Sequence, residues 1–175
     1  MKIKILVTGG AGYIGSILIP HLLKNKDYEI TVLDNLFYKQ NSLSQNFYNK
    51  NFKFIKADIC DYTIVNKLIT KFDIIIPLAA IVGAPACNQM PAKSKLINYD
   101  AQLNLINNTS KNQIVIFPTT NSGYGVGQKN EYCDENSPLN PISEYAIDKV
   151  KIEKIFMERG NAISFRLATV FGMSL

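Results

Sequence analysis

The sequence is poor in the residue types that build disulfide frameworks and most metal centres. Its 175 residues include three cysteines (Cys60, Cys87 and Cys133), the single histidine His21 and no tryptophan. Three widely spaced cysteines fit neither a disulfide framework nor a zinc-binding spacing. His21 stands in a helical apolar pattern, where a structural role is expected. We therefore expect buried or half-buried free thiols and no metal site.

Long apolar runs and clusters of like charge are also missing. No apolar stretch approaches the roughly 20 residues needed to span a bilayer. The short apolar run near Lys2 and Lys4 leads into a glycine turn instead of a signal-peptide cleavage site. The net charge is +5, but the lysines are scattered and form no stripe typical of nucleic-acid binding. The sequence predicts a cytoplasmic protein of one domain, residues 1–175, with neither membrane nor nucleic-acid partners.

Short apolar runs alternate with helical patterns along the chain. Strands are predicted over 4–8, 29–33, 52–57, 72–78, 113–118 and 162–167. Helices are predicted from the first glycine turn to about residue 26, and over 62–71, 92–110 and 143–159, with loops over 35–51 (including a weak helix) and 123–141. Strand–helix alternation is typical of a parallel sheet with helices on both faces and right-handed crossovers. We therefore predict an α/β fold, a Rossmann-type doubly wound parallel sheet.

A glycine-rich turn follows the first predicted strand, with glycines at Gly9, Gly12 and Gly15. The first permits a tight turn, the second lets the backbone approach a pyrophosphate, and the third lets the helix pack on the sheet. Amide groups at the start of the helix, around Tyr13 and Ile14, then face the phosphates. Because the turn lies between a strand and a helix, it predicts a dinucleotide site.

The end of the second predicted strand indicates which dinucleotide is bound. Asp34 lies there, 19 residues after Gly15, and is followed by Asn35. A carboxylate at this place accepts hydrogen bonds from the adenosine ribose and repels a 2′-phosphate. No arginine is near enough in sequence to receive such a phosphate. The sequence therefore favours NAD over NADP as the cofactor.

The ends of the next two strands complete the predicted cofactor site. Asp58, followed by Ile59, either contacts the adenine amino group or caps the next helix. The small residues in Leu78-Ala79-Ala80 let the cofactor pass over the fourth strand.

Three residues near the fifth strand and the last helix carry the predicted chemistry. Tyr145 and Lys149 are four residues apart, on one face of a helix. A nearby ammonium favours the phenolate, so the tyrosine is expected to act as a base below its usual pKa of about 10. Thr120 can hydrogen-bond the substrate oxygen that Tyr145 deprotonates. The alternative is an exposed aromatic beside a solvated lysine.

These motifs together resemble the extended short-chain dehydrogenase/reductase family, in its nucleotide-sugar epimerase and dehydratase branch. The segments that carry the resemblance are Thr8–Gly15, Asp34-Asn35, Asp58-Ile59, Leu78-Ala79-Ala80, Asn98, Thr120 with Tyr124-Gly125, Tyr145 with Lys149, and Arg166 to Gly172.

The resemblance implies a role for each of these groups. Tyr145 would be the base at a sugar hydroxyl, Lys149 would hold the nicotinamide ribose, and Thr120 would orient the hydroxyl. Asn98 would help to shape the cofactor and active site. NAD would take a hydride from a sugar carbon and return it, without net redox change. The substrate would be a nucleotide-sugar.

Departures from the family pattern narrow the activity. Asn121 and Ser122, expected to contact substrate with Thr120 and Tyr145, stand where dehydratases have an Asp-Glu pair. Without that pair, water elimination lacks its acid and base. An epimerase is therefore favoured, and a reductase or dehydratase of the same family remains the alternative. Pro77 and Thr169 also depart from the pattern and leave the sugar undetermined.

The resemblance also bears on organisation. Relatives continue into a second, substrate-holding domain, so we expect a truncated chain that comprises the NAD-binding domain. Relatives often form homodimers through two helices, here 92–110 and 143–159. A non-catalytic, regulatory NAD-binding module is the alternative from another functional class.

Overall fold

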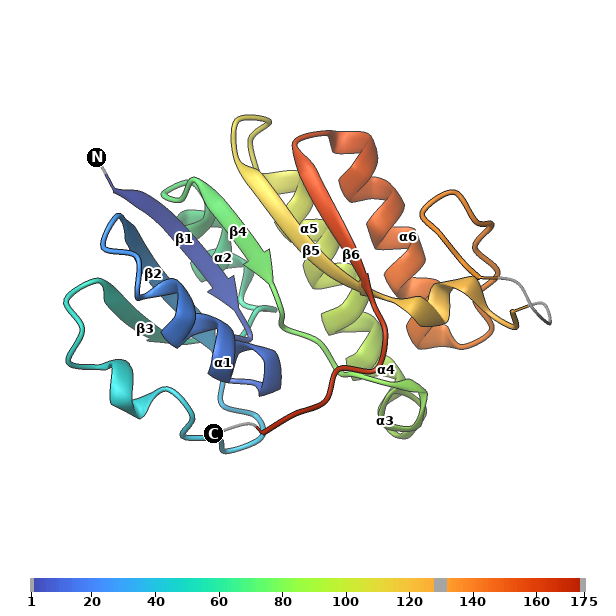
Figure 1. The fold of residues 1–175 in the computed structure, drawn as a ribbon, viewed down its shortest axis with the longest axis horizontal. Coiled ribbons are helices and arrows are strands. Elements are labelled where there is room, and N and C mark those ends of the chain that lie inside the picture. Colours follow the sequence, from blue (N-terminus) through green and yellow to red (C-terminus); the bar gives the residue numbers. More distant parts are fainter. Residues whose placement is uncertain (1, 128–131, 174–175) are drawn as a thin grey trace.

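The protein folds around one six-stranded parallel sheet (Figure 1). This computed structural model describes residues 2–127 and 132–173. The strands are β1 (Ile3–Thr8), β2 (Tyr28–Asp34), β3 (Phe52–Lys56), β4 (Ile74–Pro77), β5 (Ile114–Thr120) and β6 (Ala162–Leu167). Their order across the sheet is β3-β2-β1-β4-β5-β6, and every neighbouring pair is parallel. The predicted doubly wound fold is confirmed, and its topological switch point lies between β1 and β4.

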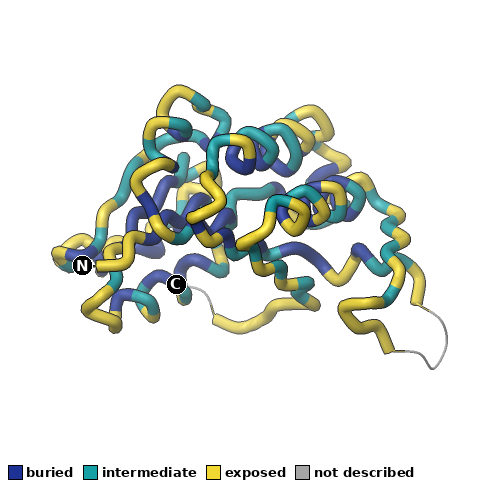
Figure 2. Tube along the Cα trace, turned by 90° about the horizontal axis from the view of Figure 1, so that it is seen from above, coloured by how far each residue is buried: buried dark blue, intermediate teal, exposed yellow. Residues whose placement is uncertain are grey.

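Helices cover both faces of the sheet, as Figure 1 shows. They are α1 (Tyr13–Leu22), α2 (Tyr62–Ile69), α3 (Ala84–Gln89), α4 (Pro91–Lys95), α5 (Ala101–Asn108) and α6 (Glu144–Arg159). The 3-10 turns η1 (Ser44–Asn46) and η3 (Asn121–Tyr124) and the π-helical segment η2 (Leu96–Asp100) complete the elements. One apolar cluster packs α1 on β1 and β2, and a second packs α2, α5 and α6 on the other face. Figure 2 shows the buried residues concentrated between these layers.

The structure differs from the predicted elements at the ends of several elements and in the segment from α3 to α5. The long helix predicted over 92–110 begins at Pro91 and contains η2 between α4 and α5. The short helix α3 was not predicted. Strand β5 extends to Thr120, so this residue is held by the sheet. The loop predicted over 123–141 begins within η3, and its residues 128–131 lie outside the described residues.

Helix α6 has a well-defined start and a packed face. The Ser143 hydroxyl accepts a hydrogen bond from Ala146 N at 3.2 Å, which caps the helix just before Tyr145. Phe156 packs on Phe117 of β5, with ring centroids 4.7 Å apart. The cap and the aromatic contact fix both the start of α6 and its seat on the sheet.

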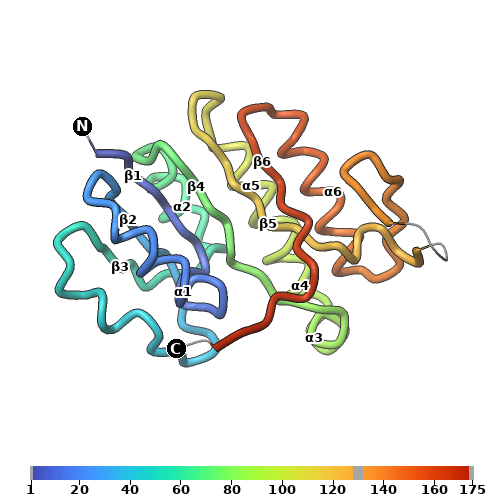
Figure 3. Tube along the Cα trace, viewed as in Figure 1, coloured from blue at the N-terminus to red at the C-terminus, as the bar shows by residue number. Residues whose placement is uncertain are grey.

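The chain leaves β6 across the carboxyl edge of the sheet. Figure 3 shows this segment running from β6 toward α1. It is exposed over residues 168–173, and the Tyr13 hydroxyl donates to the Gly172 carbonyl at 2.8 Å. The segment thus lies beside the strand ends where ligands bind in this type of sheet.

The cysteines follow the prediction in part. Cys87 is buried and Cys60 half-buried, as expected, but Cys133 is exposed, so the expectation is wrong for that residue. Within residues 2–127 and 132–173, no group of three or more His, Cys, Asp or Glu side chains is arranged to hold a metal ion. In the same ranges, no helix has the length and apolar character needed to cross a bilayer.

Candidate functional site

A cavity of about 710 Å³ runs along the carboxyl ends of the strands. Its volume is within the range of ligand-binding pockets. The predicted site residues that line it are Gly9, Gly12, Tyr13, Ile14, Gly15, Asp34, Asn35, Ile59, Leu78, Ala79, Ala80, Thr120, Asn121, Ser122, Tyr145 and Lys149. Of the predicted set, Asp58 and Asn98 do not line it. The cavity therefore brings the predicted cofactor residues and the predicted reactive residues into one space.

The glycine-rich turn at one end of the cavity has no room for side chains. Gly9 has a φ of +68°, and a Cβ there would lie 2.5 Å from the Ala79 backbone. A Cβ on Gly15 would lie 2.0 Å from the carbonyl oxygen of Gly10. No side chain caps α1, whose first residues Tyr13 and Ile14 line the cavity. Bare backbone at a helix N-terminus fits a pyrophosphate, as predicted.

The carboxylate of Asp34 is fixed beside this turn. Its Oδ2 accepts a hydrogen bond from Ala11 N at 2.9 Å, and its Oδ1 accepts one from Leu36 N at 2.8 Å. Each carboxylate oxygen can accept a further hydrogen bond. The residue therefore fits the ribose hydroxyls of a dinucleotide, and its negative charge disfavours a 2′-phosphate.

Asp58 supports the cavity wall from behind. Its carboxylate accepts hydrogen bonds from Asn35 Nδ2 at 2.8 Å and from Cys60 N at 2.9 Å. Burial raises the pKa of the Asp58 carboxyl, but these hydrogen bonds outweigh burial and the net pKa is lowered. The suggested helix-capping role is wrong, because Asp61 caps α2 by accepting from Ile64 N at 3.2 Å. Asp58 instead orients Asn35, which does line the cavity.

Asn98 acts in the same indirect way. It is fully buried in η2, where its Oδ1 accepts from Ile81 N at 2.9 Å and its Nδ2 donates to Ile81 O at 2.8 Å. Gln102, also fully buried, donates from Nε2 to Ala79 O at 3.1 Å. Both amides thus hold the segment that follows β4 and lines the cavity. Sequence reasoning missed Ile81 and Gln102, although the four-residue spacing of Asn98 and Gln102 places them on one helix face.

We expect Asn98→Ala to destabilise the protein by about 2 kcal/mol, because it leaves the buried N–H of Ile81 without a partner and removes one of the two hydrogen bonds to the Ile81 carbonyl, which keeps that from Cys87 Sγ. Denaturant unfolding measures the change. Asn107→Ala, at an exposed position of α5, is the matched control and should stay within about 0.5 kcal/mol of the wild type. Equal stability of the two variants would contradict the role given to Asn98.

The predicted reactive residues stand at the opposite end of the cavity from Asp34. Thr120 ends β5, and its Oγ1 accepts from Ser122 N at 3.1 Å, which leaves the hydroxyl proton available. Tyr145 and Lys149, one turn apart on α6, are 9% and 4% exposed. The Lys149 Nζ lies 4.9 Å from the ring centroid of Phe117. Within the described ranges, no carboxylate lies within ion-pair distance of this ammonium.

Burial decides the protonation of both residues. It raises the pKa of Tyr145 to about 12, with a further contribution from Cys87. It lowers the pKa of Lys149 to about 8. The expectation that Tyr145 has a pKa below its usual value is therefore wrong for this structure, because burial disfavours the charged phenolate. Lys149 still carries its charge at pH 7.

One family model, the NAD dependent epimerase/dehydratase family, matches residues 5–174, a range that contains every residue lining the cavity. The chain belongs to this family. The resemblance stated from the motifs is thereby confirmed, and NAD, the predicted cofactor, is the cofactor of the family.

Individual members of the NAD dependent epimerase/dehydratase family agree with this assignment. The UDP-glucose 4-epimerase of Lactobacillus helveticus is 29% identical, over 98% of this chain and 52% of its own length. The dTDP-D-glucose 4,6-dehydratase of Mus musculus is 32% identical, over 86% of this chain and 44% of its own. The chain thus spans about half the length of these curated relatives.

A solved structure of a family member superposes on the fold. The UDP-glucuronic acid 4-epimerase of Bacillus cereus, in complex with NAD, matches with a TM-score of 0.86 and 28% identity. The match covers 99% of this chain and 58% of that one. The similarity therefore includes all of the elements that line the cavity.

Proposed function

We propose that this protein is an NAD-dependent nucleotide-sugar epimerase that acts by transient oxidation of a sugar hydroxyl. One observation carries the proposal: Thr120, Tyr145 and Lys149 line the same cavity as the glycine-rich turn and Asp34. Groups that can move a proton at a hydroxyl therefore face the space that fits a dinucleotide. The family and the nucleotide-sugar enzymes within it support the substrate class.

Thr120, Tyr145 and Lys149 each have a separate role in this reaction. Bound NAD supplies a hydride acceptor and, when oxidised, a positive charge that opposes the effect of burial on the pKa of Tyr145. The Thr120 hydroxyl, already fixed as an acceptor from Ser122 N, donates a hydrogen bond to the sugar oxygen and orients it. The phenolic oxygen of Tyr145 takes the proton of the sugar hydroxyl and later returns it. Lys149 holds the cofactor ribose and keeps a positive charge beside the site.

The epimerase is favoured over the dehydratase by the residues that follow Thr120. Asn121 and Ser122 both line the cavity, and neither is an acid or base that could assist elimination of water. Relatives of both activities match the chain, so product analysis is the deciding experiment.

The experiment incubates the purified protein with a panel of nucleotide-sugars. Chromatography should show interconversion of two epimers, and the product should have no new ultraviolet absorbance in alkali. Such absorbance would identify a keto-deoxy sugar and a dehydratase. Binding of NAD without conversion of any sugar, together with a cellular role that survives Tyr145→Phe, would establish the non-catalytic regulatory module instead.

We expect the protein to prefer NAD to NADP, because the charge of Asp34 opposes a 2′-phosphate. Asp34→Asn removes that charge and keeps the size of the side chain. The dissociation constant of NADP divided by that of NAD should fall by about tenfold, as measured by calorimetry. Asp27→Asn, an exposed position before β2 at the other end of that strand, removes the same charge and should leave the ratio unchanged. An unchanged ratio in Asp34→Asn would contradict the cofactor assignment of this residue.

The homodimer and the cytoplasmic location stay predictions. The two helices that the family resemblance names for this contact, 92–110 and 143–159, correspond to the segment from α4 to α5 and to α6, and α5 packs against α6 on one face of the sheet (Figure 1). Light scattering of the purified protein would test the dimer.

A further inference from the structure

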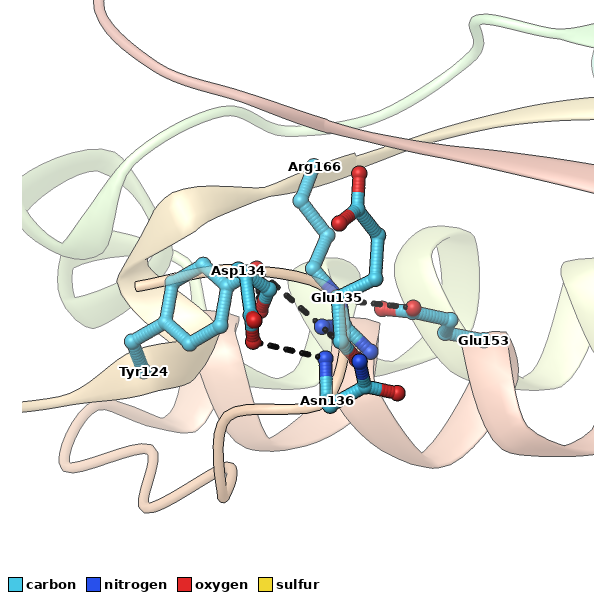
Figure 4. Close-up of polar contacts among 6 residues, drawn as sticks. All are labelled: Tyr124, Asp134, Glu135, Asn136, Glu153 and Arg166. Carbon is cyan, nitrogen blue, oxygen red and sulfur yellow. Dashed lines mark hydrogen bonds and ion pairs between the residues drawn. The ribbon is translucent and has the colours of Figure 1, made fainter. Parts of the chain in front are cut away.

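A second cavity, of about 880 Å³, adjoins the candidate active site, and Asn121 and Leu167 line both. Arg166 of β6 lies in its wall and contacts two other parts of the chain that are distant in sequence (Figure 4). None of the groups described so far as reactive or cofactor-binding is among its partners.

The contacts of Arg166 are short and well oriented. Its Nε donates to Glu153 Oε1 at 2.8 Å, and the two side chains are 19% and 7% exposed. Its Nη1 donates to the Tyr124 hydroxyl at 3.1 Å and to the Glu135 carbonyl at 3.2 Å. The Tyr124 hydroxyl in turn donates to the Asp134 carbonyl at 2.9 Å. Three residues are thus held directly by one planar guanidinium, and Asp134 is held through Tyr124.

These contacts join the two elements next to the predicted reactive residues, helix α6 and the turn η3. Glu153 lies one turn after Lys149 and two turns after Tyr145 on α6. Tyr124 ends η3, the turn that begins directly after Thr120 and is capped by the Thr120 side chain. Arg166 therefore ties the helix that carries Tyr145 to the turn that starts at Thr120.

The two tied elements are in direct contact, so their separation is sensitive to small shifts. A Cβ on Gly123 of η3 would lie 2.9 Å from Val150 Cγ2 of α6. A buried ion pair adds little net stability over apolar packing, because desolvation offsets its attraction. A fixed guanidinium geometry does restrict orientation. The Arg166–Glu153 pair is thus better suited to setting geometry than to stabilising the fold.

We propose that Arg166, Glu153 and Tyr124 are positioning residues that set the separation of Thr120 and Tyr145. The proposal rests on the proposed function, since it gives that pair of side chains a shared substrate oxygen. Displacement of reacting groups by about 1 Å can lower a rate by about a hundredfold. Loss of the network should therefore lower kcat more than it alters binding.

The test uses two mild variants of the network and one matched control. Tyr124→Phe keeps the ring and removes both hydroxyl hydrogen bonds, and Glu153→Gln keeps an acceptor for Arg166 but removes the charge. Glu158→Gln alters the exposed Lys154–Glu158 pair on the same helix, where the charged atoms are 3.8 Å apart. We expect kcat to fall about tenfold to a hundredfold in the network variants, with unchanged NAD affinity, and no change in the control.

Hydrogen–deuterium exchange supplies a readout that does not depend on turnover. Amides of residues 121–125 should exchange faster in both network variants, while those of β1 and α1 keep the wild-type rate. If the wild type converts no nucleotide-sugar, the proposed function fails, and the exchange at 121–125 still decides the positioning role. Exchange at the wild-type rate would overturn the proposal, as would faster exchange throughout the chain with loss of NAD binding, which marks a purely structural role.

Discussion

Tyr145→Phe should lower kcat for nucleotide-sugar conversion by about 10²- to 10⁴-fold, the contribution typical of a general acid–base group. The change removes only the phenolic oxygen, which is the atom that exchanges the proton with the sugar hydroxyl. The ring remains, and it belongs to the larger apolar cluster of the core. NAD binding and the folded structure should therefore be retained. Steady-state kinetics would measure the fall in kcat, and the cofactor content after denaturation would show that NAD binding is retained.

A matched control removes the same atom elsewhere. Tyr48 is 98% exposed and does not line the cavity, so Tyr48→Phe should have the kinetics of the wild type. A Tyr145→Phe variant that retains most of its kcat would assign proton transfer to another group and would remove the central argument for the enzyme.

Lys149→Met should raise the free energy of unfolding at pH 7 by as much as about 3 kcal/mol. Burial lowers the pKa of Lys149 from 10.5 to about 8, and a depression of that size is worth about 3 kcal/mol against the charged form. Methionine fills a similar volume without a charge to desolvate. The same substitution removes the ammonium that would hold the cofactor ribose, so stability and NAD affinity should change in opposite directions.

The pH dependence of unfolding provides an independent test that the charge of Lys149 destabilises the folded protein. Below about pH 8 the folded and unfolded chains both hold the proton, and the wild type bears the full penalty. Between about pH 8 and 10.5 the unfolded chain binds more protons, so the stability of the wild type rises with pH. The advantage of Lys149→Met should shrink over this interval. Lys151→Met, at an exposed position of α6, should differ from the wild type in stability by an amount that does not change over this interval. A stability difference between Lys149→Met and the wild type that does not depend on pH would contradict the buried ammonium.

Tyr145 acts in the opposite direction at higher pH. Its pKa is raised from 10 to about 12, so between these values the folded chain keeps a proton that the unfolded chain has released. Stability should therefore fall over that interval, and the fall should be smaller in Tyr145→Phe. The difference between wild type and variant, measured at each pH, isolates this group from the other tyrosines.

Most of the fold could be predicted from the sequence, because the elements have strong local signals. The apolar runs at β1 and β4 and the helical periodicity of α2 are examples, and the predicted topology is observed. The predictions failed where no such signal exists. Helix α3 is six residues long and contains a proline, and η2 departs from α-helical hydrogen bonding within a continuous helix. Cys133 shows the same limit, since a single residue in a loop has no period from which to predict burial.

The candidate site divides in the same way. Residues that line the cavity were recognisable because each follows a strand or repeats on a helix face, as Asp34 and Lys149 do. The roles of Asp58 and Asn98 could not be recognised from the sequence, since their partners Asn35 and Ile81 are 23 and 17 residues away. Such pairs form only when separate elements pack together.

The sequence by itself determined the backbone of the cofactor site and the spacing of the reactive pair. Glycines at a strand–helix turn and a four-residue interval on a helix have local geometric consequences that hold in any setting. The tertiary structure alone decided the protonation of Tyr145 and Lys149 and the partners of Arg166. The reason is physical: desolvation and long-range hydrogen bonds depend on which elements enclose a side chain, and that enclosure exists only after β5, β6 and α6 have packed together.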